Sequence, residues 1–141
     1  MSVSVSIIVP CYNVAAYLDQ CMESLTGQSM EDIEIICVND GSSDRTAEIL
    51  REWRNRDRRV RIIDQKNSGV SAARNSGMAA AAGTYIGFVD PDDMVERNMF
   101  QRLFDAAAEK EADVAVCGYH EFCDCGDMDM PERGWSPSAG F

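Results

Sequence analysis

Residues 85–93 read Tyr-Ile-Gly-Phe-Val-Asp-Pro-Asp-Asp, a short apolar, β-rich run that ends in three carboxylates. Oxygen-rich clusters suit hard divalent cations such as Mg²⁺ and Mn²⁺, and a cation held where a strand ends can neutralise the phosphates of a nucleotide. A helix start explains the same residues about as well, with Asp92 or Asp93 capping a helix that begins near Met94. The rest of the chain decides between a metal site and a cap.

The composition favours one acidic domain. A chain of 141 residues with 45% hydrophobic content can bury one core and leaves little room for a second. The net charge of −11 argues against nucleic acid as a partner, because nucleic-acid binding needs a basic surface. Residues 51–61 are an exception, with six arginines against Glu52 and Asp57. This run favours a solvated helix face and loop, with a membrane-surface patch as the alternative.

The N-terminus of this sequence lacks the basic start and cleavage site of a signal peptide, and no apolar run is long enough to cross a bilayer. We therefore expect a cytoplasmic, soluble protein. The alternative is peripheral association with the inner face of the membrane through the arginines of residues 51–61. Three of the six cysteines lie in segments typical of regular structure, which indicates reduced core thiols: Cys11, Cys21 and Cys37. A zinc site is disfavoured because the remaining candidates lack paired CxxC spacing: Cys117, Cys123, Cys125 and His120.

Strand and helix patterns alternate along the chain. Apolar, strand-like runs occupy residues 5–9, 33–38, 60–63, 85–89 and 114–117. Helical patterns lie between them, and we expect Asn13 to cap the first, Ser42 or Ser43 the second, residues 71–82 to form the third and residues 95–110 the fourth. This order predicts an α/β fold: a mostly parallel twisted sheet with helices on both faces, in a Rossmann-like three-layer sandwich.

Parallel sheets of this kind bind ligands beyond the carboxyl ends of their strands. Polar turn segments follow the first four strand-like runs, at residues 10–13, 39–44, 64–69 and 90–93. A dinucleotide-binding domain would instead carry a GxGxxG fingerprint after its first strand, and residues 10–15 contain no glycine. The sequence therefore predicts a ligand site at this edge that is not an NAD site.

Four segments in this order resemble the successive signatures of family 2 glycosyltransferases with the GT-A nucleotide-sugar fold. They are Ser6-Ile7-Ile8-Val9-Pro10-Cys11-Tyr12-Asn13, Val38-Asn39-Asp40-Gly41-Ser42-Ser43-Asp44, Asn67-Ser68-Gly69-Val70-Ser71-Ala72-Ala73-Arg74-Asn75 and Phe88-Val89-Asp90-Pro91-Asp92-Asp93. Each motif alone is weak, and the set of four in order is specific.

The resemblance implies that the first two segments hold the nucleoside. Pro10, Tyr12 and Asn13 would line the base and ribose pocket, with the Tyr12 ring as a stacking face. The alternative for these residues is a turn that simply ends a strand. Asp40 would accept the imide N–H of uracil, and its alternative is an Asx turn before a helix.

The resemblance also assigns roles to the other two segments. Gly69 would allow close backbone approach, and Arg74 would reach the nucleotide or order the acidic loop, unless it is an ordinary surface arginine. Asp90 and Asp92 would form the DXD pair, touching the ribose and the metal, with Asp93 as a further metal contact or a helix cap.

The implied reaction is transfer of a sugar from a nucleoside diphosphate, expected to be a UDP-sugar, to an acceptor hydroxyl, with Mn²⁺ or Mg²⁺ and inversion at the anomeric carbon. The acceptor would be a saccharide or a lipid-linked molecule in polysaccharide synthesis. A nucleotidyltransferase is disfavoured because residues 10–16 lack a glycine-rich, basic loop.

The acceptor half is short in this sequence. We expect residues 1–119 to form the donor-binding domain and residues 120–141 to form either the start of the acceptor region or a disordered tail. The conceivable catalytic bases match no family motif, so the base is unassigned: Glu121, Asp124, Asp127 and Glu132. The alternative to an active transferase is therefore a fragment that binds the nucleotide-sugar without turnover.

Overall fold

The computed structural model describes residues 2–121. Strands and helices alternate there, in the order β1 (Val5–Cys11), α1 (Leu18–Thr26), β2 (Ile33–Asp40), α2 (Thr46–Arg56), β3 (Val60–Gln65), α3 (Val70–Ala80), β4 (Tyr85–Phe88) and α4 (Met99–Glu109). These strands form one sheet in the spatial order β3-β2-β1-β4, and every neighbouring pair is parallel. The expected α/β class is confirmed.

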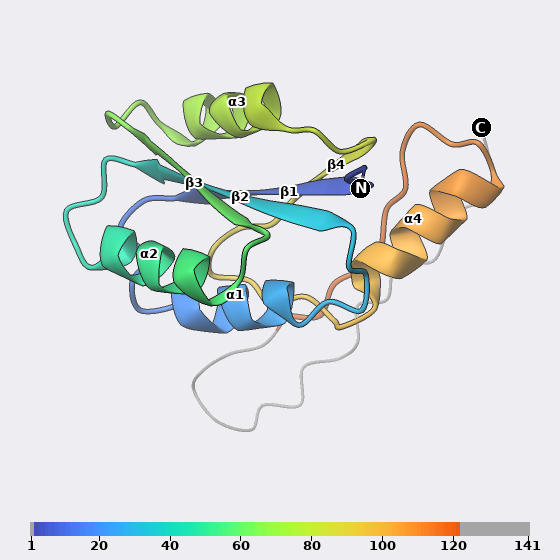
Figure 1. The fold of residues 1–141 in the computed structure, drawn as a ribbon, viewed down its shortest axis with the longest axis horizontal. Helices are drawn as coiled ribbons and strands as arrows, with labels where there is room; N and C mark the ends of the chain where they lie inside the picture. Colours follow the sequence, from blue (N-terminus) through green and yellow to red (C-terminus); the bar gives the residue numbers. More distant parts are fainter. Residues whose placement is uncertain (1, 122–141) are drawn as a thin grey trace.

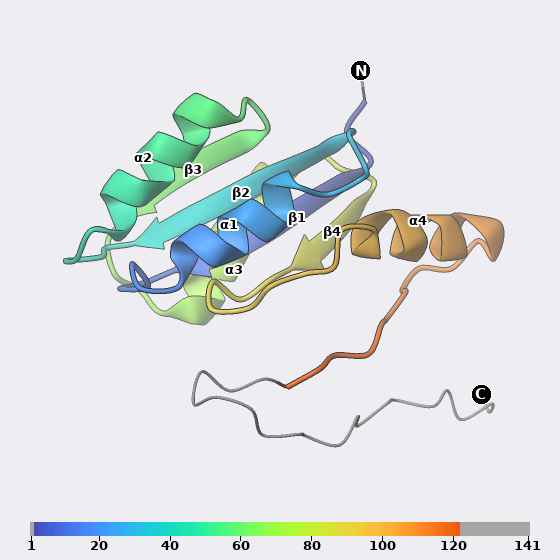
Figure 2. The same ribbon diagram turned by 90° about the horizontal axis from the view of Figure 1, so that it is seen from below.

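Helices cover both faces of the sheet. Figure 1 shows α1 and α2 on one face and α3 on the other, and Figure 2 shows α4 beside β4. The two central strands, β1 and β2, are buried along their whole length. Because successive side chains point to opposite faces, alternate residues of each strand enter different cores. Ile7 and Ile35 pack in the core with α1 and α2, whereas Ile36 and Val38 pack with Ala73 of α3.

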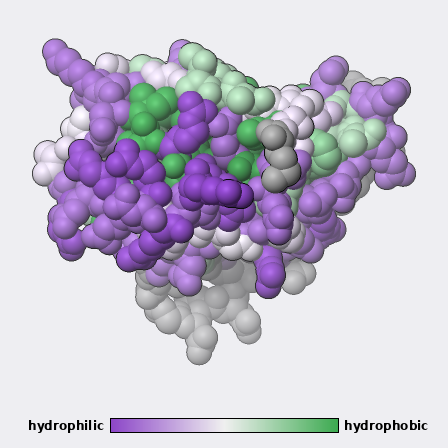
Figure 3. Space-filling model, viewed as in Figure 1, coloured by the Kyte–Doolittle hydropathy of each residue, from purple (hydrophilic) through white to green (hydrophobic). Residues whose placement is uncertain are grey.

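Helix α3 lies close to the sheet because its contact residues are small. A Cβ added at Gly77 would approach Ile8 Cγ2 to 2.5 Å, so this position has no room for a side chain. The helix begins at Val70 and ends at Ala80, two residues before the expected end. In the view of Figure 3, hydrophobic side chains form patches in the upper part of this face, interrupted by hydrophilic ones, and hydrophilic side chains cover the lower part.

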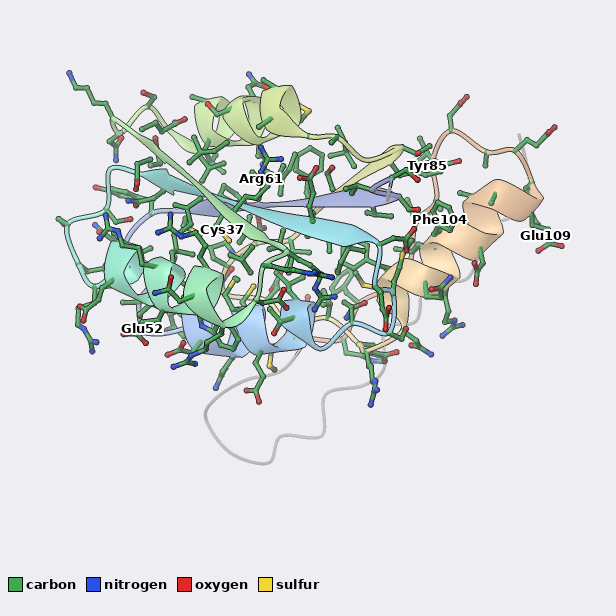
Figure 4. All side chains as sticks on the ribbon, viewed as in Figure 1. Cys37, Glu52, Arg61, Tyr85, Phe104 and Glu109 are labelled. Atoms are coloured by element: carbon green, nitrogen blue, oxygen red, sulfur yellow. The ribbon has the colours of Figure 1, made fainter. Side chains whose placement is uncertain are left out.

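A buried carboxylate ties the strands together at the opposite edge from the predicted site. Glu34 Oε1 accepts hydrogen bonds from Ser6 Oγ at 2.6 Å and from the Ala82 backbone N–H at 2.7 Å, and Arg61 Nη1 lies 2.5 Å from Glu34 Oε2. Arg61 points from β3 towards this network (Figure 4). Burial alone would raise the pKa of Glu34, but the hydrogen bonds from Ser6, Ala82 and Arg61 outweigh it and lower that pKa.

The arginine-rich run is partly tied into the fold. Arg59 Nη2 donates to the Thr26 carbonyl at 2.6 Å, where α1 ends, and also pairs with Asp57 at 2.7 Å. Arg56 lies near Glu52 and over the Trp53 ring. These contacts favour a helix face and loop, and the membrane patch stays a prediction. Among residues 2–121, no helix has the length and apolar character needed to cross a bilayer.

The expected fifth strand at residues 114–117 is wrong. This segment pairs with no strand in the described part of the chain, and Val114 and Val116 are 75% and 66% exposed. An apolar run becomes a strand only when a neighbouring strand supplies hydrogen-bond partners. The chain instead turns back along α4, where Tyr85 Oη donates to the Ala112 carbonyl at 2.9 Å and the Tyr85 and Phe104 rings meet edge to face (Figure 4).

The prediction of reduced core thiols is confirmed. Cys11, Cys21 and Cys37 are buried free thiols, and Cys117 is free and exposed. Within residues 2–121, no group of three or more histidine, cysteine, aspartate or glutamate side chains is placed to hold a metal ion. Cys123, Cys125 and the candidate bases after Glu121 lie outside the described residues, as does most of the expected second region at residues 120–141.

Candidate functional site

The loops that follow β1 and β2 are bonded to each other at the carboxyl edge of the sheet. Asn13 Oδ1 accepts hydrogen bonds from the backbone N–H groups of Ser43 at 2.8 Å and Asp44 at 3.3 Å. The Asn13 N–H donates to Ser42 Oγ at 3.1 Å. Asn13 therefore ties two loops and does not cap α1, which begins at Leu18. Its φ of 50° lies in the left-handed region, which asparagine tolerates better than most residues.

Asp44 and Thr46 are structural residues of the site that the sequence analysis missed. Asp44 Oδ1 accepts from the Thr46 N–H at 2.9 Å, and Asp44 Oδ2 accepts from the Ala15 N–H at 3.1 Å. Thr46 Oγ1 is buried and accepts from the Val14 N–H at 3.0 Å. The Asp44 side chain thus accepts from the first N–H of α2, whose N-cap position is held by Arg45, and the expected cap at Ser42 or Ser43 is wrong. The signal was an aspartate two residues before the helix, a spacing typical of Asx turns.

Asp40 ends β2 and is buried, at 3% exposure. Its Oδ1 accepts from Gln65 Nε2 and from the Ser68 N–H, both at 2.8 Å, and its Oδ2 accepts from the Gly69 N–H at 2.9 Å. Burial alone would raise the pKa of Asp40, but these three hydrogen bonds lower it. A carboxylate offers about four acceptor positions, and these bonds occupy three of them in Asp40.

Two glycines shape the backbone around Asp40. Gly41 has a φ of 71°, and a Cβ there would lie 2.7 Å from the Asn67 backbone nitrogen. Gly69 has a φ of 91°, and a Cβ there would meet open space. The loops after β2 and β3 therefore touch at Gly41, whereas Gly69 leaves room beside its backbone. That room agrees with the close approach expected at Gly69 and does not test it.

The residues expected to line the base pocket differ in their exposure. Tyr12 is 50% exposed, so its ring is free to stack. Pro10 is buried within β1, opposite Val38 of β2, because β1 continues to Cys11 instead of ending at Val9. The structure thus exposes Tyr12 at the carboxyl edge of the sheet and buries Pro10 within β1.

The acidic segment 90–93 follows β4 as an exposed turn over α1. Cys21 of α1 donates from Sγ to the Asp90 carbonyl at 3.7 Å. Burial raises the pKa of Cys21 to about 12, and Cys11 and the three aspartates add to this effect. Helix α4 begins only at Met99, so Asp92 and Asp93 do not cap it, and the cap interpretation is wrong.

The three aspartates repel one another. The pKa of Asp93 is raised, first by partial burial and then by the charges of Asp92 and Asp90. Asp92 and Asp93 each carry carboxylate oxygens, the ligands that Mg²⁺ and Mn²⁺ prefer. As the described residues form no three-ligand group, the expected set of Asp90, Asp92 and Asp93 is not a preformed cage. Mg²⁺ commonly binds through one or two carboxylates together with substrate phosphates, and these residues fit that arrangement.

Arg74 reaches the acidic segment from α3. Its Nη2 lies 2.9 Å from Asp90 Oδ1, and the side chains of Arg74 and Asp90 are 38% and 51% exposed. The Nε atom of Arg74 is buried and has no hydrogen-bond partner among the described residues. Of the two roles expected for Arg74, the structure shows contact with the acidic loop.

The site therefore gathers residues from four loops that are distant in sequence. Asp40 ends β2 and Asp90 follows β4, and these strands lie on either side of β1. Two strand spacings separate them, roughly 10 Å. An anchored, ionised carboxylate thus lies on one side of the site and a repelling group of carboxylates on the other, with an exposed aromatic ring after β1.

Comparison with known proteins identifies the family of this chain. The family model "Glycosyl transferase family 2" matches residues 6–139. The chain is 52% identical over 117 residues to the uncharacterized glycosyltransferase EpsJ of Bacillus subtilis, covering 83% of this chain and 34% of that protein.

Solved structures give the same result. The structure of S. aureus TarS residues 1–349 in complex with UDP-GlcNAc has a TM-score of 0.68 and 31% identity, covering 77% of this chain and 31% of that one. The mannosyltransferase PcManGT of Pyrobaculum calidifontis, in complex with GDP-Man and Mn²⁺, shares the fold, with a TM-score of 0.62 at 22% identity over 67% of this chain and 29% of that one. The chain spans about a third of the length of these proteins.

Proposed function

The chain belongs to glycosyltransferase family 2, and we propose that residues 2–121 bind the nucleotide-sugar donor of a UDP-sugar-dependent transferase. The observation that carries this proposal is that Asp40 and the acidic segment 90–93 lie on opposite sides of β1, at the same edge of the sheet. One side offers a fixed acceptor for a base N–H, and the other offers charges that bind a diphosphate only with a cation present. The UDP-GlcNAc complex of TarS, 31% identical to this chain, supports uridine as the base.

Each residue has a defined part in donor binding. The free acceptor position of Asp40 takes the uracil imide N–H, and the Tyr12 ring stacks on the base. The open space beside Gly69 admits the ribose and diphosphate. Asp90 and Asp92 supply one or two carboxylate ligands, with Asp93 nearby. A bound Mn²⁺ or Mg²⁺ supplies charge neutralisation for the leaving diphosphate.

Sugar transfer completes the proposed function. An acceptor hydroxyl of a saccharide or lipid-linked molecule attacks the anomeric carbon with inversion, as the bond from that carbon to the diphosphate oxygen breaks and UDP leaves. An enzyme carboxylate takes the proton of that hydroxyl.

Calorimetry with UDP tests the donor site. A diphosphate meets like charge at Asp90, Asp92 and Asp93, so we expect UDP to bind much more tightly with Mn²⁺ than with EDTA. Asp92→Asn should remove most of this gain without lowering the melting temperature, because Asp92 is exposed. Asp105→Asn is the matched control, since Asp105 is an exposed aspartate of α4 whose carboxylate, within residues 2–121, accepts a bond only from Gln101. Equal UDP affinity in Mn²⁺ and in EDTA would show that the acidic segment is not a metal site.

A second candidate function is donor binding without transfer. The observation in its favour is that the chain matches about a third of each relative. A chain with residues 1–141 would then bind UDP-sugar and hydrolyse it slowly at most. Steady release of UDP that requires an added saccharide acceptor would favour the complete transferase.

A further inference from the structure

Arg74 and Asp90 form a half-exposed ion pair inside the proposed donor site. The pair joins α3 to the turn after β4, with 2.9 Å between Arg74 Nη2 and Asp90 Oδ1. Arg74 uses only this one contact, since its buried Nε has no partner among the described residues. The guanidinium therefore retains a donor that faces no acceptor.

We propose that Arg74 is an internal counterion that neutralises Asp90 until the metal ion arrives and then transfers to the donor diphosphate, so that metal and nucleotide bind cooperatively. This inference rests on the proposed function and adds a coupling between its two ligands. It also assigns Arg74 as a ligand-binding residue with two alternative partners.

Competition for Asp90 is the first step of the argument. A divalent cation and a guanidinium both need the carboxylate oxygens of Asp90, and they repel each other at short range. A metal ion that takes Asp90 as a ligand therefore displaces or distorts the Arg74–Asp90 pair. A pair this exposed is weak, so its loss should change metal affinity by about two- to fivefold.

The fate of the displaced guanidinium is the second step. Arginine presents its N–H groups in a planar fork that matches the oxygens of a phosphate. A diphosphate that enters with the metal gives the half-exposed end of the Arg74 guanidinium a new acceptor. The phosphate contact thus offsets the loss of the Arg74–Asp90 ion pair, a loss that is not offset when the metal binds without nucleotide. Each ligand therefore strengthens binding of the other by the same factor.

Other ion pairs in the described residues do not have this position. Arg61 and Glu34 lie at the opposite edge of the sheet, and Arg59 bonds the end of α1. Arg45, which precedes α2, and Glu48 of α2 form an exposed pair. Arg45→Gln is therefore a control that removes one positive charge without touching Asp90.

The test measures Mn²⁺ affinity by electron paramagnetic resonance, with and without UDP, in residues 1–141. Arg74→Gln should bind Mn²⁺ alone about two- to fivefold more tightly than the wild type, whereas Arg45→Gln should not. The same Arg74→Gln variant should bind UDP more weakly in saturating Mn²⁺ and show a smaller enhancement of Mn²⁺ binding by UDP. Arg74→Lys retains the charge without the fork, so it should keep the Mn²⁺ affinity of the wild type and lose UDP affinity.

Circular dichroism first establishes that each variant is folded. If Arg74→Gln does not fold, the UDP affinity of Arg74→Lys is the test. Unchanged or weaker Mn²⁺ affinity in folded Arg74→Gln would overturn the proposal, as would undiminished UDP affinity in Arg74→Lys. Failure of UDP to bind the wild type under any condition would instead refute the proposed function. The Mn²⁺ affinities of Arg74→Gln and the wild type would still measure the competition between Arg74 and the metal for Asp90.

Discussion

Asp40 and the acidic segment 90–93 lie at the same edge of one sheet, yet their carboxylates differ in burial and in hydrogen bonding, and the pKa shifts of Asp40 and Asp93 have opposite directions. Asp40 is buried and accepts three hydrogen bonds, which lower its pKa. Asp90, Asp92 and Asp93 are exposed, and their mutual repulsion helps to raise the pKa of Asp93. One side of the site is complete before the ligand binds, and the other needs a cation.

The positions of the two strands explain this difference. Strand β2 has a neighbour on each side, so the loop after it meets the loops after β1 and β3. Strand β4 pairs only with β1 in the described residues, and two side chains on one of its faces, Ile86 and Phe88, are 43% and 47% exposed. The turn after β4 is held mainly by Cys21 and Arg74. A loop at a sheet edge has fewer anchors and more freedom to accept a ligand.

Among these variants, removal of the Asp40 carboxylate should lower the free energy of unfolding most. Asp40→Ala leaves the N–H groups of Ser68 and Gly69 without their acceptor, and we expect it to lower the free energy of unfolding by about 3 kcal/mol. Urea denaturation measures this loss. Asp64→Ala is the control, because Asp64 is exposed and accepts one bond, from Asn39 Nδ2. Equal losses in the two variants would show that Asp40 is not the anchor of the site.

The two glycines with positive φ should respond unequally to a methyl group. Gly41→Ala adds a contact of 2.7 Å with the Asn67 backbone to the strain of its φ, so we expect a loss of about 2 kcal/mol. Gly69→Ala has the strain without the contact, so we expect about 1 kcal/mol. Thermal unfolding of both variants gives the order, and a larger loss at Gly69 would contradict the loop contact at Gly41.

Asp93→Asn should give the smallest effect and the opposite sign. A raised pKa means that ionised Asp93 destabilises the folded chain at neutral pH, and this penalty fades as the pH falls through the folded-state pKa. We therefore expect Asp93→Asn to raise stability at pH 7 by under about 0.5 kcal/mol, because the residue is exposed.

Melting temperatures of Asp93→Asn and wild type between pH 7 and pH 3 check this sign, since the gain should disappear on acidification. Asp40 has the opposite linkage: its lowered pKa contributes stability that is present at neutral pH and lost as the pH falls through that pKa. A stabilisation by Asp93→Asn that grew towards acid would show that repulsion among the aspartates is not its cause.

The sequence alone determined the alternation of strands and helices, the parallel sheet and the edge at which the site lies. These features depend on local apolar periodicity, as in Ile7 to Val9 and Ile35 to Val38, and on the order of four short motifs. They also placed Asp40 and Asp90 at strand ends, because parallel strands bring their carboxyl ends to one edge.

Only the tertiary structure decided which groups each residue contacts. Asp40 bonds residues 25 to 29 positions away, and Arg74 meets Asp90 16 positions away, through loops that come together only when the strands pair. The start of α4 at Met99 and the absence of a strand at residues 114–117 in the described chain depend equally on neighbours. Local pattern predicts what a segment can form, and the available hydrogen-bond partners decide what it does form.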